Sequence, residues 1–215
     1  MTEITIIEPQ LIEGRSFEII SEILGERLQQ IPAEQQGIVK RVIHTSADFD
    51  YADNLLFSPD AVGSALAALR GGCTVVTDTR MAYAGINQRN LGRLGAAKAC
   101  YIDAPEVAEQ AKAQGITRAT VAMQQAALQP ENRIFAVGNA PTALLALREL
   151  ILADKLQPAL VVGVPVGFVN VVEAKELFWE LAQERNIPCI IARGRKGGSN
   201  VAAAIINALM LAALA

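Results

Sequence analysis

The chain has 215 residues, of which 52% are hydrophobic and 5% aromatic, and its formal net charge is -3. This length suits one α/β domain and buries enough surface to fold without disulfides or metals. The acidic balance excludes a broad basic surface for nucleic acid, but it is compatible with a local basic pocket. His44 is the only histidine, which excludes zinc sites built from several histidines and any histidine pair.

Cysteine usage and hydropathy predict a cytoplasmic protein without a membrane partner. Cys73, Cys100 and Cys189 lie far apart and form no CxxC pair, so neither a metal site nor a redox dithiol is indicated. Residues 1–10 are acidic and lack the pattern of a signal peptide. The longest apolar stretch, 201–215, is shorter than the roughly 20 residues that a membrane span needs.

The first predicted elements are two amphipathic helices. One covers residues 15–28 and has an apolar stripe that includes Phe17 and Ile23. The other begins near Pro32 and ends at or just before His44. Both precede the first predicted strand.

Five apolar runs rich in β-branched residues predict strands that are covered on both faces, as in a parallel sheet. Helical segments separate the runs, several of them opened by proline and closed by glycine. This alternation predicts a single-domain three-layer α/β/α sandwich, Rossmann-like, with a mostly parallel five- or six-stranded sheet. The domain spans 1–215, with N-terminal helices in 1–50 and the α/β core in 73–215. The predicted strands are 73–78, 99–103, 133–138, 159–164 and 188–192.

Ligands of open α/β sheets bind beyond the carboxyl ends of the strands, which makes the segments that follow the strands the expected site. Four such segments, rich in Gly, Pro, Asn or Thr, are 78–85, 138–142, 163–168 and 194–200. No GxGxxG follows a strand and no GxxxxGK[ST] is present, so the dinucleotide and P-loop fingerprints are both missing.

The segment GRKGGS at 194–199 opens the last predicted helix. Free N–H groups there, beside Arg193, Arg195 and Lys196, would hold a phosphate or a carboxylate. An ordinary basic loop explains the same residues equally well. Local sequence therefore leaves both interpretations open.

His44 lies one helical turn after Arg41, so both side chains can face one ligand. An isolated histidine at a helix end is more often only hydrogen-bonded there, but an anion held beside it by arginine suits acid catalysis. Asp78 ends a predicted strand and is either a helix cap or a site residue. Arg118 begins a helix, where its charge opposes the macrodipole and hints at an anionic partner.

Three longer motifs occur in a fixed order: GNAPTAL at 138–144, PVGFV at 165–169 and GRKGGS at 194–199. With these motifs, nearly the whole chain resembles the precorrin-8X methylmutase family, also called precorrin isomerase or cobalt-precorrin-8 methylmutase, of corrin (cobalamin) biosynthesis. The shorter matching pieces are GRSF at 14–17, RVIHT at 41–45, FSP at 57–59, Asp78 with Met81 and Gly85, TR at 117–118 and NAL at 207–209.

The resemblance implies an isomerase that moves a methyl group from carbon 11 to carbon 12 of precorrin-8X or cobalt-precorrin-8, giving hydrogenobyrinate or cobyrinate. It implies His44 as the proton donor and acceptor, no separate cofactor, no metal ligands and a homodimer with sites at the subunit interface. The candidate substrate-binding residues, from the resemblance and from the helix-start segments, are Arg15, Ser16, Arg41, Asp78, Arg118, Asn139, Gly197, Gly198 and Ser199.

Two other classes of function are compatible with the fold. A non-catalytic tetrapyrrole carrier would keep the anion clamp and perform no chemistry, whereas a nucleotide-dependent Rossmann enzyme would bind a dinucleotide. The single histidine and the missing fingerprints favour the isomerase, because an intramolecular shift needs one proton-transfer group and no nucleotide.

Overall fold

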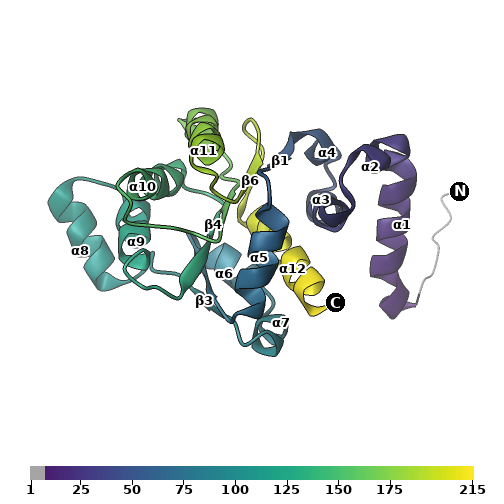
Figure 1. Cartoon of the computed structure of the whole chain (residues 1–215), viewed down its shortest axis with the longest axis horizontal. Helices are drawn as coiled ribbons and strands as arrows, with labels where there is room; N and C mark the ends of the chain where they lie inside the picture. Colours follow the sequence, from purple (N-terminus) through teal and green to yellow (C-terminus); the bar gives the residue numbers. More distant parts are fainter. Residues whose placement is uncertain (1–7) are drawn as a thin grey trace, which may run out of the picture.

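A computed structural model of the protein, which describes residues 8–215, shows one six-stranded sheet between two layers of helices (Figure 1). The strand order is β1-β6-β5-β4-β2-β3. Neighbouring strands are parallel except β1, which is antiparallel to β6. The expectation that residues 1–10 form no signal peptide falls mostly outside the described residues. The strands are β1 (Leu55–Phe57), β2 (Thr74–Thr77), β3 (Ala97–Ala99), β4 (Asn132–Val137), β5 (Leu160–Gly163) and β6 (Cys189–Ala192).

Both faces of the sheet are buried, as the nearly continuous apolar runs predict. In β4, Ile134 and Ala136 face one helical layer, whereas Phe135 and Val137 face the other. Figure 1 shows α5 and α12 on one side of the sheet and α9 and α10 on the other. The first layer contains α3 (Ala33–Ser46), α5 (Ala61–Arg70) and α12 (Ser199–Leu214), and the second contains α8 (Pro105–Gln114), α9 (Arg118–Ala126), α10 (Pro141–Leu152) and α11 (Val171–Arg185).

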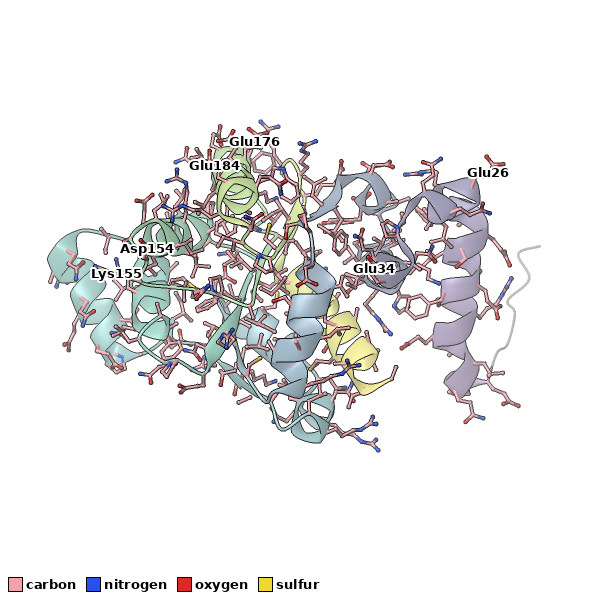
Figure 2. The ribbon with its side chains drawn as sticks, in the orientation of Figure 1. Glu26, Glu34, Asp154, Lys155, Glu176 and Glu184 are labelled. Atoms are coloured by element: carbon pink, nitrogen blue, oxygen red, sulfur yellow. The ribbon has the colours of Figure 1, made fainter. Side chains whose placement is uncertain are left out.

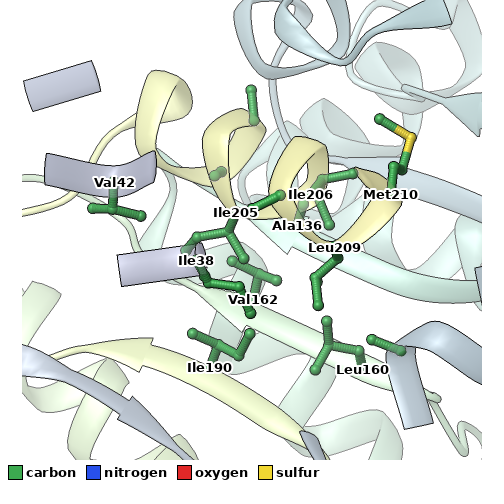
Figure 3. Close-up of a cluster of buried hydrophobic side chains, with 14 of the residues drawn as sticks. Ile38, Val42, Ala136, Leu160, Val162, Ile190, Ile205, Ile206, Leu209 and Met210 are labelled. Atoms are coloured by element: carbon green, nitrogen blue, oxygen red, sulfur yellow. The ribbon is translucent and has the colours of Figure 1, made fainter. Parts of the chain in front are cut away.

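The apolar C-terminal helix α12 is covered by the chain itself. It packs against α3, α5 and α6 (Arg80–Gly85) as well as against the sheet. Figure 3 shows Ile205, Ile206 and Leu209 of α12 beside Val162 of β5 and Ile38 of α3. Other parts of the same chain therefore bury most of this helix, and Leu211 remains 42% exposed. Among residues 8–215, no helix is both long and apolar enough to cross a membrane.

The N-terminal region differs from the expected pair of helices. Its first part is divided at Gly25, which has a φ of +52°, into α1 (Ile12–Leu24) and α2 (Glu26–Gln30). The expected stripe is wrong at Ile23, which is 60% exposed, whereas Ile20 and Leu24 pack against the core. The remaining elements are η1 (Pro9–Leu11), α4 (Tyr51–Asn54) and α7 (Gln88–Arg93).

Two strands differ from the prediction. The strand expected at 99–103 lies instead at Ala97–Ala99, because the chain turns away from the sheet before Tyr101. The strand β1, at Leu55–Phe57, was not expected, since three apolar residues are too short a run to distinguish from a loop. As an antiparallel edge strand, β1 begins beside Ala192 at the carboxyl end of β6. The segment that follows α3 is thereby carried to that edge of the sheet.

Charged side chains lie at the periphery of the molecule. Figure 2 shows Glu176 and Glu184 projecting outward from α11, and Asp154 near the end of α10. The only buried charged residues among those described are Asp78 and Lys175. These two buried charges lie near the carboxyl edge of the sheet, and each binds the backbone of a loop there.

Candidate active site

The site predicted at the carboxyl ends of the strands is assembled from separate parts of the chain. Asp78 follows β2, the GNAPT segment follows β4, the PVGF segment follows β5 and the GRKGGS segment follows β6. The end of α3 reaches the same edge through β1, where Arg193 N–H donates to the carbonyl of Asn54. The start of α9 reaches it through Thr117, whose hydroxyl lies 2.8 Å from that of Thr142.

Three of these loops are in backbone contact, which explains their glycines. A Cβ on Gly197 would lie 2.1 Å from the carbonyl oxygen of Val164, and one on Gly138 would lie 2.7 Å from the Cα of Ser199. Gly198 N–H also donates to the Val164 carbonyl at 2.9 Å. Neither Gly197 nor Gly138 can therefore carry a side chain without moving a neighbouring loop.

Asp78 is a buried residue that holds one loop of the site in place. Its side chain is buried, and its carboxylate accepts hydrogen bonds from the N–H groups of Gly138, Asn139 and Ala140 at 2.8–2.9 Å. Burial raises the pKa of Asp78, and the three amides oppose that rise. Asp78 thus holds the loop before α10, whereas the helix that follows Asp78, α6, is capped by Thr79, so the expected cap of that helix is wrong.

His44 lies in the last turn of α3 and is exposed to solvent. Its ring is tilted against that of Phe17, with centroids 5.4 Å apart, and the Arg41 guanidinium lies 4.7 Å from the same phenyl centroid. Phe17 of α1 therefore contacts both functional side chains of the RVIH motif. The sequence pattern predicts Phe17 only as part of an apolar stripe, because its two partners come from another helix.

Arg41 is already paired in the free chain. Its Nη2 lies 2.8 Å from Oε1 of Glu13, and this hydrogen bond lowers the pKa of the Glu13 carboxyl. Arg41 also lines two hollows, of about 290 and 560 Å³, and Glu13 lines the larger one with it. Neither of the two hollows is lined by His44, which faces open solvent in the single chain.

Lys196 joins the GRKGGS segment to the region that follows His44. Its Nζ lies 2.6 Å from a carboxylate oxygen of Asp48 and 2.6 Å from one of Asp50. These bonds raise the pKa of Lys196 and lower that of Asp48. The basic segment after β6 and the end of the histidine helix are thus held together by a charged contact 146 residues apart in sequence.

Some of the other predicted site residues are exposed, and others already have hydrogen-bond or ion-pair partners within the chain. Arg118 and the side chain of Asn139 are exposed, and within residues 8–215 no salt bridge holds Arg118. Ser199 lies at the start of α12, and its hydroxyl is 2.8 Å from that of Thr79. On α1, Ser16 donates to the Ile12 carbonyl, while Arg15 forms ion pairs with Glu18 and Glu22.

Cys73 and Cys189 lie at the amino ends of β2 and β6, away from this edge, whereas the half-buried Cys100 directly follows β3. Cys73 and Cys189 are buried, and burial raises their thiol pKa values to about 11 and about 12. Among residues 8–215, no three His, Cys, Asp or Glu side chains gather as a metal site would require. The matching motifs themselves contribute an imidazole, several guanidinium groups and the backbone amides of helix-start loops.

Glycine-rich loops and helix starts at the carboxyl edge of a Rossmann-like sheet, with a histidine and arginines on neighbouring helices, are typical of enzymes that bind anionic ligands. Comparison with known proteins identifies the class further. The chain belongs to the precorrin-8X methylmutase family, whose family model, described as Precorrin-8X methylmutase, matches residues 11–212. It is an isomerase of cobalamin biosynthesis, as the sequence motifs predicted.

Individual relatives agree over nearly the full length of the chain. The cobalt-precorrin-8 methylmutase of Salmonella typhimurium is 47% identical, covering 94% of this chain and 95% of the relative. The precorrin-8X methylmutase of Pseudomonas aeruginosa is 40% identical, covering 93% and 94%. The crystal structure of precorrin-8X methylmutase from Thermus thermophilus is 38% identical, covers 95% of this chain and 96% of that one, and superposes with a TM-score of 0.86. The expected fold class and family are confirmed.

Proposed function

We propose that this isomerase moves the methyl group of a precorrin-8 macrocycle from carbon 11 to carbon 12, with His44 as the proton donor and acceptor. Substrate and product of such a shift are isomers, so the reaction needs no second substrate. The observation that carries this proposal is the position of His44, exposed one turn after Arg41 and four residues before Asp48, which Lys196 of the GRKGGS segment binds. Imidazole has a reference pKa near 6.5, which suits reversible proton exchange at neutral pH.

Because the reaction consumes no proton overall, His44 must both donate a proton to the macrocycle and take one back. A proton donated to the macrocycle as the methyl group migrates must be recovered, because an isomerisation consumes no proton overall. One imidazole at an open edge can donate and then regain it. Phe17, which packs against the ring of His44, limits the rotation of the imidazole and so favours one orientation toward the substrate.

The carboxylates of the macrocycle would bind basic and amide groups on α1 and α3 and at the starts of the helices that follow the strands. Arg41 and Arg118 supply guanidinium groups, and Gly197, Gly198 and Ser199 supply the start of α12. Asn139 supplies an exposed side chain at the start of α10, and Arg15 and Ser16 supply polar groups from α1. Asp78 acts through the backbone of residues 138–140 and has no direct contact with the ligand in this proposal.

The cobalt-containing macrocycle is the form that we propose as substrate. The relatives from Salmonella typhimurium and Priestia megaterium, 47% and 44% identical, are both named cobalt-precorrin-8 methylmutase. The relative named precorrin-8X methylmutase from Pseudomonas aeruginosa is 40% identical. Turnover of both forms, measured side by side, would show which one is preferred.

We also propose that the active unit is a homodimer. Ile12, Ser16, Ile19 and Ile23 follow one another at helical spacing on the outward face of α1, and the three isoleucines are 41–60% exposed. A second copy on this face would cover these isoleucines and place Ser16 at the interface. Light scattering of the purified protein should give twice the chain mass, and Ile19→Glu with Ile23→Glu should give a monomer.

The substitution His44→Ala tests the function. Purified wild-type protein should convert cobalt-precorrin-8 to cobyrinate without added cofactor, with the absorption change of an isomerised chromophore. His44→Ala should lose about 100-fold or more in kcat while still binding cobyrinate, because proton transfer is removed and the binding groups remain. Full activity of the variant would refute the mechanism. Binding without turnover by the wild type would favour a tetrapyrrole carrier.

A further inference from the structure

Lys175 of α11 is a buried cation that the reaction described above does not use. Only 1% of the residue is exposed, yet within residues 8–215 no carboxylate lies within salt-bridge distance of its ammonium group. Its Nζ instead donates to two backbone carbonyls, those of Gly194 and Lys196, at 2.8 Å each. An ammonium group buried on two neutral acceptors costs free energy, which calls for a compensating role.

The two carbonyls belong to the segment that we assign to substrate binding. In a trans peptide, the C=O of one residue and the N–H of the next point in opposite directions. Because Lys175 holds the carbonyls of Gly194 and Lys196 on its own side, the N–H groups of Arg195 and Gly197 are directed away from it. Within the described chain, neither of these two N–H groups has a hydrogen-bond acceptor. Two unpaired amides on one turn, between basic side chains, form a binding place for a carboxylate.

The other contacts of residues 194–199 involve a side chain or the ends of the turn, so Lys175 is the group that fixes the turn at residues 194–197. The side chain of Lys196 points to Asp48 and Asp50, and the Arg195 carbonyl accepts from Gly167 N–H at 3.3 Å. Gly198 N–H is bound to Val164, which fixes the far end of the turn. Burial lowers the pKa of Lys175 to about 8, as expected for a cation that has lost its water without gaining a carboxylate.

We infer that Lys175 is a positioning residue for the isomerase reaction: through the carbonyls of Gly194 and Lys196, it orients the Arg195 and Gly197 amides toward a carboxylate of the substrate. It touches neither the substrate nor the reacting atoms. This inference rests on the proposed role of residues 194–199 in substrate binding. If the inference is correct, substrate affinity depends on the buried ammonium group of Lys175, which does not contact the substrate.

The test compares Lys175→Met with a matched control, Lys98→Met. Lys98 also donates from Nζ to two backbone carbonyls, of Tyr83 at 2.8 Å and Ile86 at 2.7 Å, but away from the 194–199 segment. Lys175→Met should raise KM for cobalt-precorrin-8 by about tenfold and change kcat by less than about threefold, because His44 lies on another element. Lys98→Met should lower Tm while leaving KM within about twofold of the wild type. Lys175→Arg, which keeps the charge and the donors, should recover part of the lost affinity.

A KM within about twofold of the wild type for Lys175→Met, with only a lower Tm, would show a purely structural lysine and overturn the inference. Lys175→Gln, which keeps two N–H donors without charge, replaces Lys175→Met if the latter does not fold. Failure of both to fold, while Lys98→Met folds, would likewise assign Lys175 to stability alone.

Arg195→Ala separates this inference from the proposed function. If Arg195→Ala raises KM and Lys175→Met does not, only the positioning role is wrong. If neither substitution changes KM, residues 194–199 do not bind the substrate, and both the site assignment and the positioning role fail.

Discussion

The Arg41 guanidinium and the Glu13 carboxylate form an ion pair across α1 and α3, with Nη2 and Oε1 2.8 Å apart. In the proposed site, Arg41 binds a carboxylate of the macrocycle, so Glu13 occupies the place that the ligand would take. Substrate binding would then exchange one carboxylate for another at the same guanidinium. The ion pair with Glu13 would keep Arg41 in position in the free protein, but competition from Glu13 would lower the affinity for the substrate.

Glu13→Gln should therefore strengthen substrate binding. The neutral amide competes less well for Arg41, and we expect KM to fall about two- to fivefold with little change in kcat. Stability should change by less than about 1 kcal/mol, because the Glu13 side chain is exposed. Steady-state kinetics and urea unfolding measure both effects. Asp154→Asn, which removes the exposed Arg185–Asp154 pair at 3.4 Å, is the control and should leave KM unchanged. A raised KM in Glu13→Gln would mean that Glu13 orients Arg41.

Asp78→Asn should destabilise the protein and weaken activity together. The amide N–H₂ of asparagine would face backbone donors that now bind a carboxylate, which costs about 1–3 kcal/mol in the free energy of unfolding. Asp103→Asn, in an exposed pair with Arg80, is the matched control and should cost less than about 1 kcal/mol. Lost activity with unchanged stability would instead indicate that Asp78 contacts the ligand.

Gly197→Ala should separate two loops of the site. The new Cβ would lie 2.1 Å from the Val164 carbonyl oxygen, so one loop must move. We expect a loss of about 1–3 kcal/mol in stability and a raised KM, because the amides at the start of α12 move with the loop. Gly92→Ala, in α7 with nothing within 4 Å of the added methyl, should be neutral or stabilising. Wild-type KM in Gly197→Ala would remove this loop from the binding site.

The pH dependence of stability should reveal the buried charge of Lys175. Its pKa is about 8 in the folded protein, against a value of 10.5 for the free side chain. Between these two pH values the unfolded chain holds more protons at this lysine than the folded chain, so stability rises with pH. The free energy of unfolding of the wild type minus that of Lys175→Met should therefore increase from pH 8 to pH 10.5, as measured by urea denaturation. A constant difference would show that the ammonium group is not desolvated.

Much of this architecture follows from sequence patterns. Apolar runs predicted four of the strands closely, and the parallel-sheet rule placed the segments of Asp78, Asn139 and Gly197 at one edge. Prolines predicted the starts of α8 and α10 correctly. These signals are local or depend on general topology, which is why a single sequence contains them.

The contacts that complete the site could not be predicted in this way. Glu13 meets Arg41 28 residues away, and Lys196 meets Asp50 146 residues away, as a result of packing that no periodicity encodes. The short strand β1 decides where the segment after His44 leads, yet three apolar residues give no distinct pattern. In the sequence, Lys175 looks like any exposed lysine of an amphipathic helix, because its contacts with Gly194 and Lys196 depend on the fold.

Two contacts join early and late parts of the chain: α3 packs against α12, and Lys196 binds Asp48. During synthesis, the histidine helix leaves the ribosome with α1 and α4, but the part of its apolar face that packs against α12 stays uncovered until residues 199–214 have been made. Such long-range pairing slows folding and leaves apolar surface exposed to other chains in the meantime. We therefore expect nascent chains that lack α12 to engage chaperones and to be inactive, even though they already contain His44.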